Sequence, residues 1–241
     1  RDFRLSELFH GSNNRFDSFS LRHENLLLDY SRNYPNDATK KLLIDLAHQQ
    51  QLPQAIAAMF AGKAINNSEQ RAALHVALRE PGEFSEHGQG IDTLARMEKF
   101  VNRVQAGSWS GFDSNRITDV VNIGIGGSDL GPALVTDALS AFATGQVKLH
   151  FVSNIDPSHI ATTLLDLQPE STLFIIASKS FCTEETQRNA VAARKWLLSK
   201  LEDEKATSNH FVAITKNSAA ATNVGIDPKN IFPLWDWVGG R

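Results

Sequence analysis

The sequence predicts an α/β fold, a parallel sheet flanked by helices and preceded by an N-terminal helical segment. Two observations carry this prediction. After Gly111, short apolar runs alternate with helical patterns in units of roughly thirty residues, the length of a strand–helix–strand unit. Before it, apolar residues recur with the helical period of about 3.6 residues. We therefore expect a mainly helical segment, 1–110, packing on an α/β domain, 111–241.

The N-terminal segment contains four helical patterns. The first starts at Asp37 and has a stripe of apolar residues on one face, and the second follows Pro53. Asn67–Gln70 is typical of a helix cap and predicts a third helix that continues to Leu78. A fourth is predicted over Thr93–Gln105. The patch Leu26–Tyr30 fits either a strand or a helical turn.

In the second half, apolar runs rich in β-branched residues are typical of parallel strands buried on both faces. The predicted strands are 120–123, 147–152, 173–177 and 210–214, with 231–232 as a candidate fifth. Asp156 followed by Pro157 predicts the start of the helix after the second strand. Ligands of such sheets bind beyond the carboxyl ends of the strands.

Composition excludes several function classes. A net charge of −3 over 241 residues argues against binding to nucleic acid or to an anionic membrane. A single cysteine, Cys182, fits a cytoplasmic protein, and no Cys/His cluster has metal-site spacing. The chain begins at Arg1 and ends in the aromatic segment 235–241, so we expect a piece of a longer protein.

A glycine turn follows the first predicted strand, in the stretch Gly124-Ile-Gly-Gly-Ser-Asp-Leu-Gly-Pro132. Ser128 or Asp129 is expected to cap the next helix, whose N-terminus would present backbone N–H groups to an anion. The alternative is a tight connection without a ligand. The dinucleotide fingerprint fails because Asp129 stands where its third glycine belongs.

A second polar loop, Ser178-Lys-Ser-Phe-Cys-Thr183, follows the third predicted strand and opens its helix. Three hydroxyls, a lysine and a helix N-terminus favour phosphate binding, with the lysine supplying charge or bonding to the local backbone. Ordinary capping remains the alternative, because Glu184 and Glu185 in the first helical turn complement the helix dipole themselves.

These two motifs, with Trp235-Asp-Trp-Val-Gly-Gly-Arg241, resemble the glucose-6-phosphate isomerase (phosphoglucose isomerase) family in order and spacing. Residues 64–79 resemble that family's N-terminal helical signature, and the likeness covers about the first half of such an enzyme. The resemblance implies a sugar isomerase (SIS) domain with a flavodoxin-like, three-layer architecture. It also implies interconversion of glucose 6-phosphate and fructose 6-phosphate through a cis-enediolate, in glycolysis and gluconeogenesis, without metal or organic cofactor.

The resemblance also implies roles for individual residues. Ser178, Lys179, Ser180 and Thr183 match the family's phosphate loop, and Gly127 and Ser128 match its substrate-contacting turn. Arg241 matches the arginine that stabilises the developing enediolate; a guanidinium suits this role because it stays protonated.

Some positions depart from the family pattern. Ser180 replaces the usual threonine and keeps its hydroxyl, whereas Cys182 replaces a frequent threonine and is not predicted to bind phosphate. The family's general-base glutamate, ring-opening histidine and late lysine would lie beyond residue 241. The chain alone is therefore predicted to be inactive, and the full-length enzyme is expected to be a cytoplasmic homodimer.

Two other classes of protein are alternatives to this interpretation. A non-catalytic sugar-phosphate-binding module would be expected to lack the ending Trp235–Arg241. A nucleotide-dependent oxidoreductase would need Asp156 as an acidic ribose ligand, but Asp156-Pro157 is better explained as a helix cap.

Overall fold

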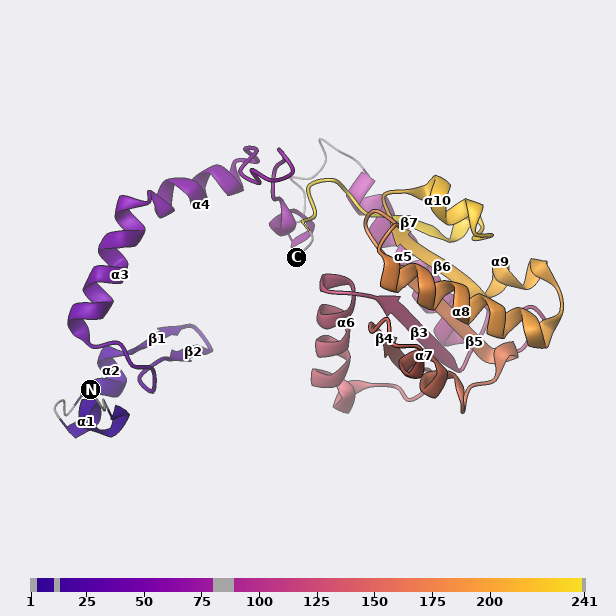
Figure 1. The fold of residues 1–241 in the computed structure, drawn as a ribbon, viewed down its shortest axis with the longest axis horizontal. Coiled ribbons are helices and arrows are strands. Elements are labelled where there is room, and N and C mark those ends of the chain that lie inside the picture. Colours follow the sequence, from indigo (N-terminus) through magenta and orange to yellow (C-terminus); the bar gives the residue numbers. More distant parts are fainter. Residues whose placement is uncertain (1–3, 11–13, 80–88, 240–241) are drawn as a thin grey trace. The chain divides into compact units, whose positions relative to one another are not determined.

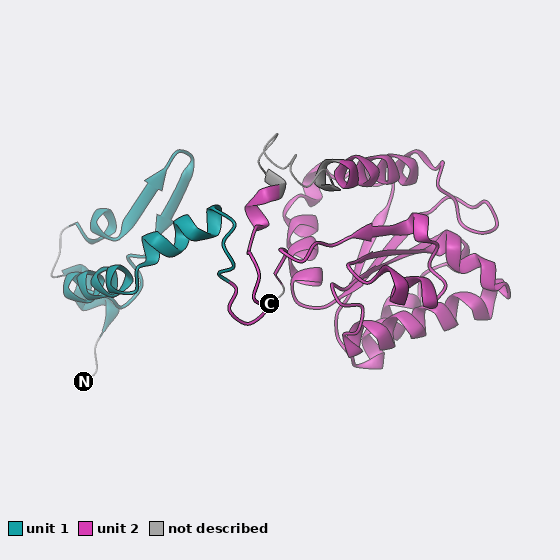
Figure 2. Ribbon diagram, turned by 90° about the horizontal axis from the view of Figure 1, so that it is seen from above, with its two compact units in different colours: residues 1–65 teal, residues 66–241 magenta. Residues whose placement is uncertain are grey.

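The computed structural model describes residues 4–10, 14–79 and 89–239, and the chain divides into two compact units, residues 1–65 and 66–241 (Figure 2). The first unit holds four helices and a hairpin among its described residues. These are α1 (Leu5–His10), α2 (Arg15–Ser18), β1 (Ser20–His23), β2 (Leu26–Asp29), α3 (Asp37–Gln49) and α4 (Leu52–Phe60). The patch at Leu26 is thus a strand, and β1 and β2 pair antiparallel. The Asn36 side chain accepts the Thr39 N–H at 2.9 Å and so caps α3, which begins at Asp37 as predicted.

The second unit is built around a five-stranded parallel sheet with the strand order β4-β3-β5-β6-β7 (Figure 1). The strands are β3 (Asp119–Gly124), β4 (Lys148–Val152), β5 (Thr172–Ala177), β6 (Phe211–Thr215) and β7 (Ile231–Pro233). The helices are α5 (Gln89–Ala106), α6 (Gly127–Ala138), α7 (Pro157–Leu164), α8 (Glu184–Leu201), α9 (Thr207–His210) and α10 (Ser218–Asn223). All five predicted strands are present, and the predicted parallel α/β fold is confirmed.

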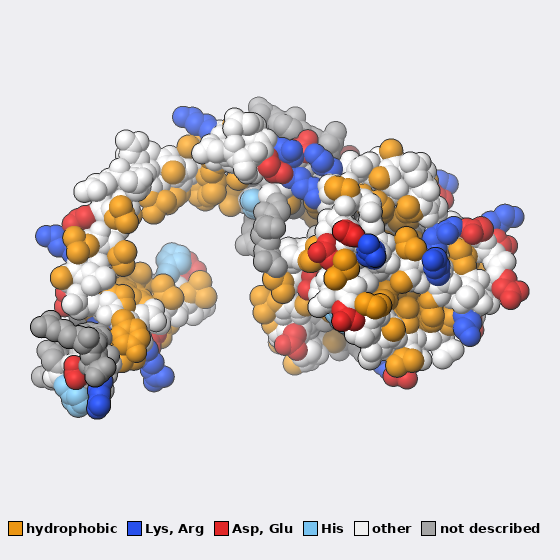
Figure 3. Space-filling view, in the orientation of Figure 1, with side chains coloured by type: hydrophobic (Ala, Val, Ile, Leu, Met, Phe, Trp, Pro, Cys, Tyr) orange, Lys and Arg blue, Asp and Glu red, His pale blue; other side chains and the backbone are white. Residues whose placement is uncertain are grey.

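Helices cover both faces of the sheet and make a three-layer structure (Figure 1). One face packs Val121 and Ile123 of β3 against α7 and α8, through Ile160, Leu164 and Leu197. The other packs Val120 and Leu173 against Val104, Phe100 and Met97 of α5. The strands β3, β5 and β6 are largely buried on both faces, which is why their sequences read as apolar runs, whereas the edge strand β4 is partly exposed. Figure 3 shows hydrophobic side chains gathered on the outer surface of α6, where Leu134 is 69% exposed.

The predicted third helix, Asn67–Leu78, is largely wrong. Residues 67–74 contain turns and an isolated bridge between Asn66 and Arg71, and only a 3₁₀ helix, His75–Arg79, follows. The capping signature does form hydrogen bonds, but they close a turn: the Asn66 side chain accepts the Glu69 N–H at 3.2 Å and the Ser68 hydroxyl at 2.8 Å. The Leu74 N–H donates to the Trp237 carbonyl, so a distant segment takes a bond that the helix would have used.

His210 joins β5, β6 and the loop that precedes β3. Its imidazole is fully buried, its Nδ1 lies 2.7 Å from the Thr172 carbonyl, and its Nε2 accepts the Phe112 N–H at 2.8 Å. These partners require a neutral ring with the proton on Nδ1. Burial lowers the pKa of His210 below its ordinary value, although the carboxylates of Asp113 and Glu170 oppose the change.

We expect this histidine to make the chain less stable in mild acid. The unfolded chain binds the proton at a higher pH than the folded chain, so the stabilisation is complete above the unfolded pKa of about 6.5. It is lost as the pH falls towards the lower, folded pKa, with a slope of at most about 1.4 kcal/mol per pH unit. Urea unfolding between pH 8 and pH 5 measures how the free energy of unfolding depends on pH. His210→Gln should reduce this slope by up to about 1.4 kcal/mol per pH unit, the contribution of one bound proton. Equal slopes for the two proteins would contradict the assignment.

Candidate functional site

The carboxyl ends of β3 and β5 form a topological switch point. From β3 the chain passes to β4 on one side of it and then to β5 on the other. The helices that follow these two central strands start on opposite faces. The side chain of Asn122, on the α5 face, donates to the Ser128 carbonyl of α6 at 2.9 Å, whereas α8 packs on the other face. Gly124 and Ala177 pair at the ends of β3 and β5, so the glycine turn and the polar loop adjoin a crevice of the kind that binds ligands in open α/β sheets.

The glycine turn is tighter than predicted. Gly126 has φ 65° and ψ −125°, a conformation open essentially to glycine alone, and α6 begins immediately after it at Gly127. Ser128 and Asp129 therefore lie inside the first helical turn, and the prediction that one of them caps the helix is wrong. A Cβ on Gly124 would lie 2.7 Å from the Ser128 carbonyl oxygen, so glycine is needed there for close approach. A Cβ on Gly127 would meet no atom of the described chain within 4 Å, which leaves room for a ligand beside the N–H groups.

The hydroxyls of the polar loop face one another. The Ser178 and Thr183 oxygens lie 3.3 Å apart, and Ser178 also accepts the Phe181 N–H at 3.2 Å, which stabilises Phe181 at φ 57°. Thr183 is the residue before α8, yet its side chain makes no capping bond. Ser180 accepts the Cys182 N–H at 3.4 Å. The loop thus brings Ser178, Ser180 and Thr183 to the N-terminus of α8, an arrangement suited to phosphate oxygens.

Lys179 bonds to neighbouring backbone. Its Nζ donates to the carbonyls of Asp236 at 3.1 Å and Val238 at 2.6 Å, and lies 3.5 Å from a Glu69 carboxylate oxygen. Of the two roles left open by the sequence, the geometry shows bonding to backbone, but to that of a segment 57 and 59 residues later rather than to the local backbone. The ammonium still adds positive charge within the loop.

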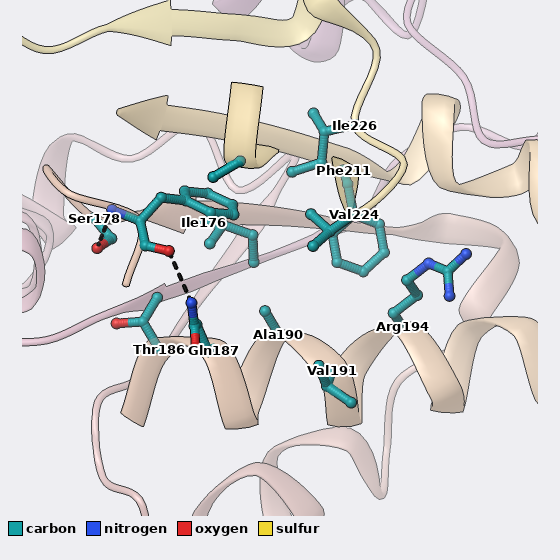
Figure 4. A pocket seen from close by; sticks show the side chains of 12 residues that line it. Ile176, Ser178, Thr186, Gln187, Ala190, Val191, Arg194, Phe211, Val224 and Ile226 are labelled. Atoms are coloured by element: carbon teal, nitrogen blue, oxygen red, sulfur yellow. Dashed lines mark hydrogen bonds between the residues drawn. The ribbon is translucent and has the colours of Figure 1, made fainter. Parts of the chain in front are cut away.

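Two cavities flank this edge of the sheet. One, of about 290 Å³, lies between α8 and the strands and is lined mainly by apolar side chains, with Ser178, Thr186 and Gln187 at one end and Arg194 at the other (Figure 4). This cavity does not suit a sugar phosphate, because most hydroxyls of the sugar would be buried there without hydrogen-bond partners. The other, of about 300 Å³, is lined by residues of the glycine turn, the loop after β4 and the first turn of α8. Its polar residues are Asp129, Ser153, Asn154 and Glu185. This second cavity is the more polar of the two and adjoins the glycine turn.

The described ranges contain no group of three or more His, Cys, Asp or Glu side chains placed to hold a metal ion. None of their helices combines the length and apolar character needed to cross a bilayer. Arg241, the predicted enediolate-stabilising residue, lies outside the described residues.

The family model described as phosphoglucose isomerase matches residues 29–241. The chain belongs to the phosphoglucose isomerase family. Its similarity to curated members extends over nearly its whole length: it is 49% identical to glucose-6-phosphate isomerase 1 of Thiobacillus denitrificans over 248 residues and 47% identical to the enzyme of Chlorobium luteolum over 244. These matches cover 100% and 98% of the chain but only 45% and 44% of the relatives, so the chain spans less than half of their length.

A solved structure supports the family assignment. The crystal structure of a glucose-6-phosphate isomerase from Chlamydia trachomatis superimposes with a TM-score of 0.76 at 26% sequence identity, covering 99% of this chain and 46% of that one. The family fold therefore includes both the N-terminal helical segment and the parallel sheet with its switch point.

The structure places near the candidate site residues that the sequence reasoning missed. Arg71 and His75 contact the segment Trp235–Gly239 from more than 160 positions away, and Glu69 pairs with Lys179. Lys216, which follows β6, also contacts the segment through Asp236. The sequence did draw attention to residues 64–79 through their resemblance to a family signature. That resemblance did not indicate which residues these side chains contact.

Proposed function

We propose that the protein containing this chain is a glucose-6-phosphate isomerase. The observation that carries the proposal is the meeting of the hydroxyl loop and the glycine turn at the switch point, in a chain of this family. Ser178, Ser180 and Thr183 would donate to the phosphate oxygens, and Gly127 and Ser128 would contact the substrate beside them. Lys179 would contribute charge while bonded to the backbone.

In the proposed reaction, a general base removes the proton on C2 of glucose 6-phosphate and returns a proton to C1, while the hydroxyl proton moves from O2 to O1. Negative charge builds on oxygen in the cis-enediolate between these steps. Arg241 would stabilise that charge, since its guanidinium does not give up its proton near neutral pH. The reaction needs neither metal nor organic cofactor, because the carbonyl itself delocalises the charge.

The expected base, ring-opening histidine and late lysine have no assigned counterpart within the 241 residues. We therefore propose that this chain by itself converts no substrate, and that residues 1–110 pack on the α/β domain 111–241 in an intact enzyme. A cytoplasmic homodimer acting in glycolysis and gluconeogenesis is the corresponding proposal for the whole protein.

The deciding experiment gives the full-length protein glucose 6-phosphate labelled with deuterium at C2. Formation of fructose 6-phosphate, with part of the label on C1 and part lost to water, is the result expected of an enediolate mechanism. Saturable binding of fructose 6-phosphate in calorimetry without turnover would favour the non-catalytic module. Binding of NADH, used as a control ligand, would overturn the isomerase proposal.

A further inference from the structure

The segment Trp235–Gly239 belongs to no helix or strand, yet side chains from distant elements hold it. Its only carboxylate, Asp236, receives the Arg71 guanidinium at 2.8 Å and the Lys216 ammonium at 2.7 Å. The hydrogen bond from Lys216, with the charges of Lys216, Arg71 and Lys179, holds the pKa of Asp236 below its usual range. Asp236 is therefore ionised at neutral pH, as both ion pairs require.

The backbone of the same segment is also bound. Lys179 donates to the Asp236 and Val238 carbonyls, and the Leu74 N–H donates to the Trp237 carbonyl at 3.1 Å. The Gly239 N–H donates to Nε2 of His75 at 3.0 Å. We call the four side chains of Arg71, His75, Lys179 and Lys216 the clasp. Together with the Leu74 N–H, the clasp contacts every residue from Asp236 to Gly239.

The clasp has two functional neighbours along the chain. Lys179 lies in the polar loop Ser178–Thr183, one residue after Ser178. Arg241 is two residues after Gly239 in the sequence. The contacts of Val238 and Gly239 thus hold the chain two residues ahead of Arg241, next to Lys179 of the loop proposed to bind the phosphate.

We propose that Arg71, His75 and Lys216 are positioning residues that fix the place of Arg241 relative to the phosphate loop, with Lys179 joining the two. This inference rests on the proposed isomerase function. A displacement of about 1 Å in a catalytic group can cost about 10²-fold in rate, so loss of one clasp contact is expected to lower kcat without removing any substrate ligand.

The test uses the full-length protein and its steady-state kinetics. We expect His75→Leu and Arg71→Gln each to lower kcat about 10- to 100-fold, on the scale of such displacements, while KM changes less than about threefold. Restoring the contact should restore the rate: His75→Gln offers a carbonyl oxygen to the Gly239 N–H, and Arg71→Lys keeps a cation beside Asp236. Arg116→Gln is the matched control, because Arg116 is an exposed arginine that bonds the Gln105 carbonyl near the opposite edge of the sheet.

A double-mutant cycle separates positioning from general support of the fold. In an Arg241→Ala background there is no guanidinium left to place, so His75→Leu should cause no further loss of kcat. An equal fractional loss in both backgrounds, no loss in either, or an equal loss in the Arg116→Gln control overturns the inference. If the unmodified protein fails to isomerise glucose 6-phosphate, the proposed function itself is wrong, which is a distinguishable result.

Discussion

Replacing Arg241 by alanine in the full-length protein is expected to lower kcat about 10²- to 10³-fold, the usual cost of removing one oxyanion donor. The reason is that negative charge develops on the substrate oxygens only on the way to the enediolate. A group that meets that charge lowers the barrier and contributes little to ground-state binding. We therefore expect KM to change by less than about threefold.

Initial rates in both directions, with glucose 6-phosphate and fructose 6-phosphate, measure this effect. Arg241→Lys should fall between the parent and the alanine variant, because an ammonium keeps the charge but lacks the planar pair of donors. A rise in KM at unchanged kcat would instead make Arg241 a ligand of the bound sugar, and the assigned role would be wrong.

Removing both loop hydroxyls, as Ser178→Ala/Thr183→Ala, is expected to raise KM about 10²- to 10³-fold. Hydrogen bonds to a charged group contribute about 1.5–3 kcal/mol each, and about 1.4 kcal/mol is tenfold in affinity. The two hydroxyls lie 3.3 Å apart, so their single effects are not expected to add. Ser178→Ala should cost more than Thr183→Ala, since Ser178 also accepts the Phe181 N–H.

Calorimetry with fructose 6-phosphate measures the same loss as binding. Thr183→Ser keeps the hydroxyl and should bind like the parent. Thr163→Ala is a control for removal of a hydroxyl elsewhere, because Thr163 bonds the His159 carbonyl within α7. If KM and affinity are unchanged in the double variant, the loop does not bind the phosphate, and the alternative of ordinary helix capping is favoured.

Sequence patterns predict the sheet well because the driving force is local and repetitive. The strand β5 is a mainly apolar run typical of a strand buried on both faces. Asp156-Pro157 starts α7 as expected, with the Asp156 side chain accepting the Ser158 N–H at 2.9 Å. The predicted helix at 67–78 failed for the opposite reason. Its polar residues bond to Asn66 and close a turn instead of capping a helix. Arg71 and Leu74 bond to a segment more than 160 residues later in the chain, and such a contact leaves no periodic trace.

The candidate site shows the same division. The positions of Ser178 and Thr183 follow from their place at a strand end, and topology brings that end beside the glycine turn. The direction of the Lys179 side chain does not follow, because a flexible lysine takes whichever acceptors the fold supplies. Nor does the start of α6 at Gly127, which depends on the backbone angles of Gly126 rather than on the polar side chains that follow.

The clasped segment carries two of the chain's four tryptophans, Trp235 and Trp237, whose indoles stack with centroids 5.0 Å apart and planes 7° from parallel. Aromatic rings held so close share their electronic transitions, so their near-ultraviolet circular dichroism and fluorescence depend on their mutual orientation. The segment therefore contains its own optical reporter. Disturbance of the backbone ahead of Arg241 is visible spectroscopically with no substrate bound, which allows local order and turnover to be followed as separate signals in one protein.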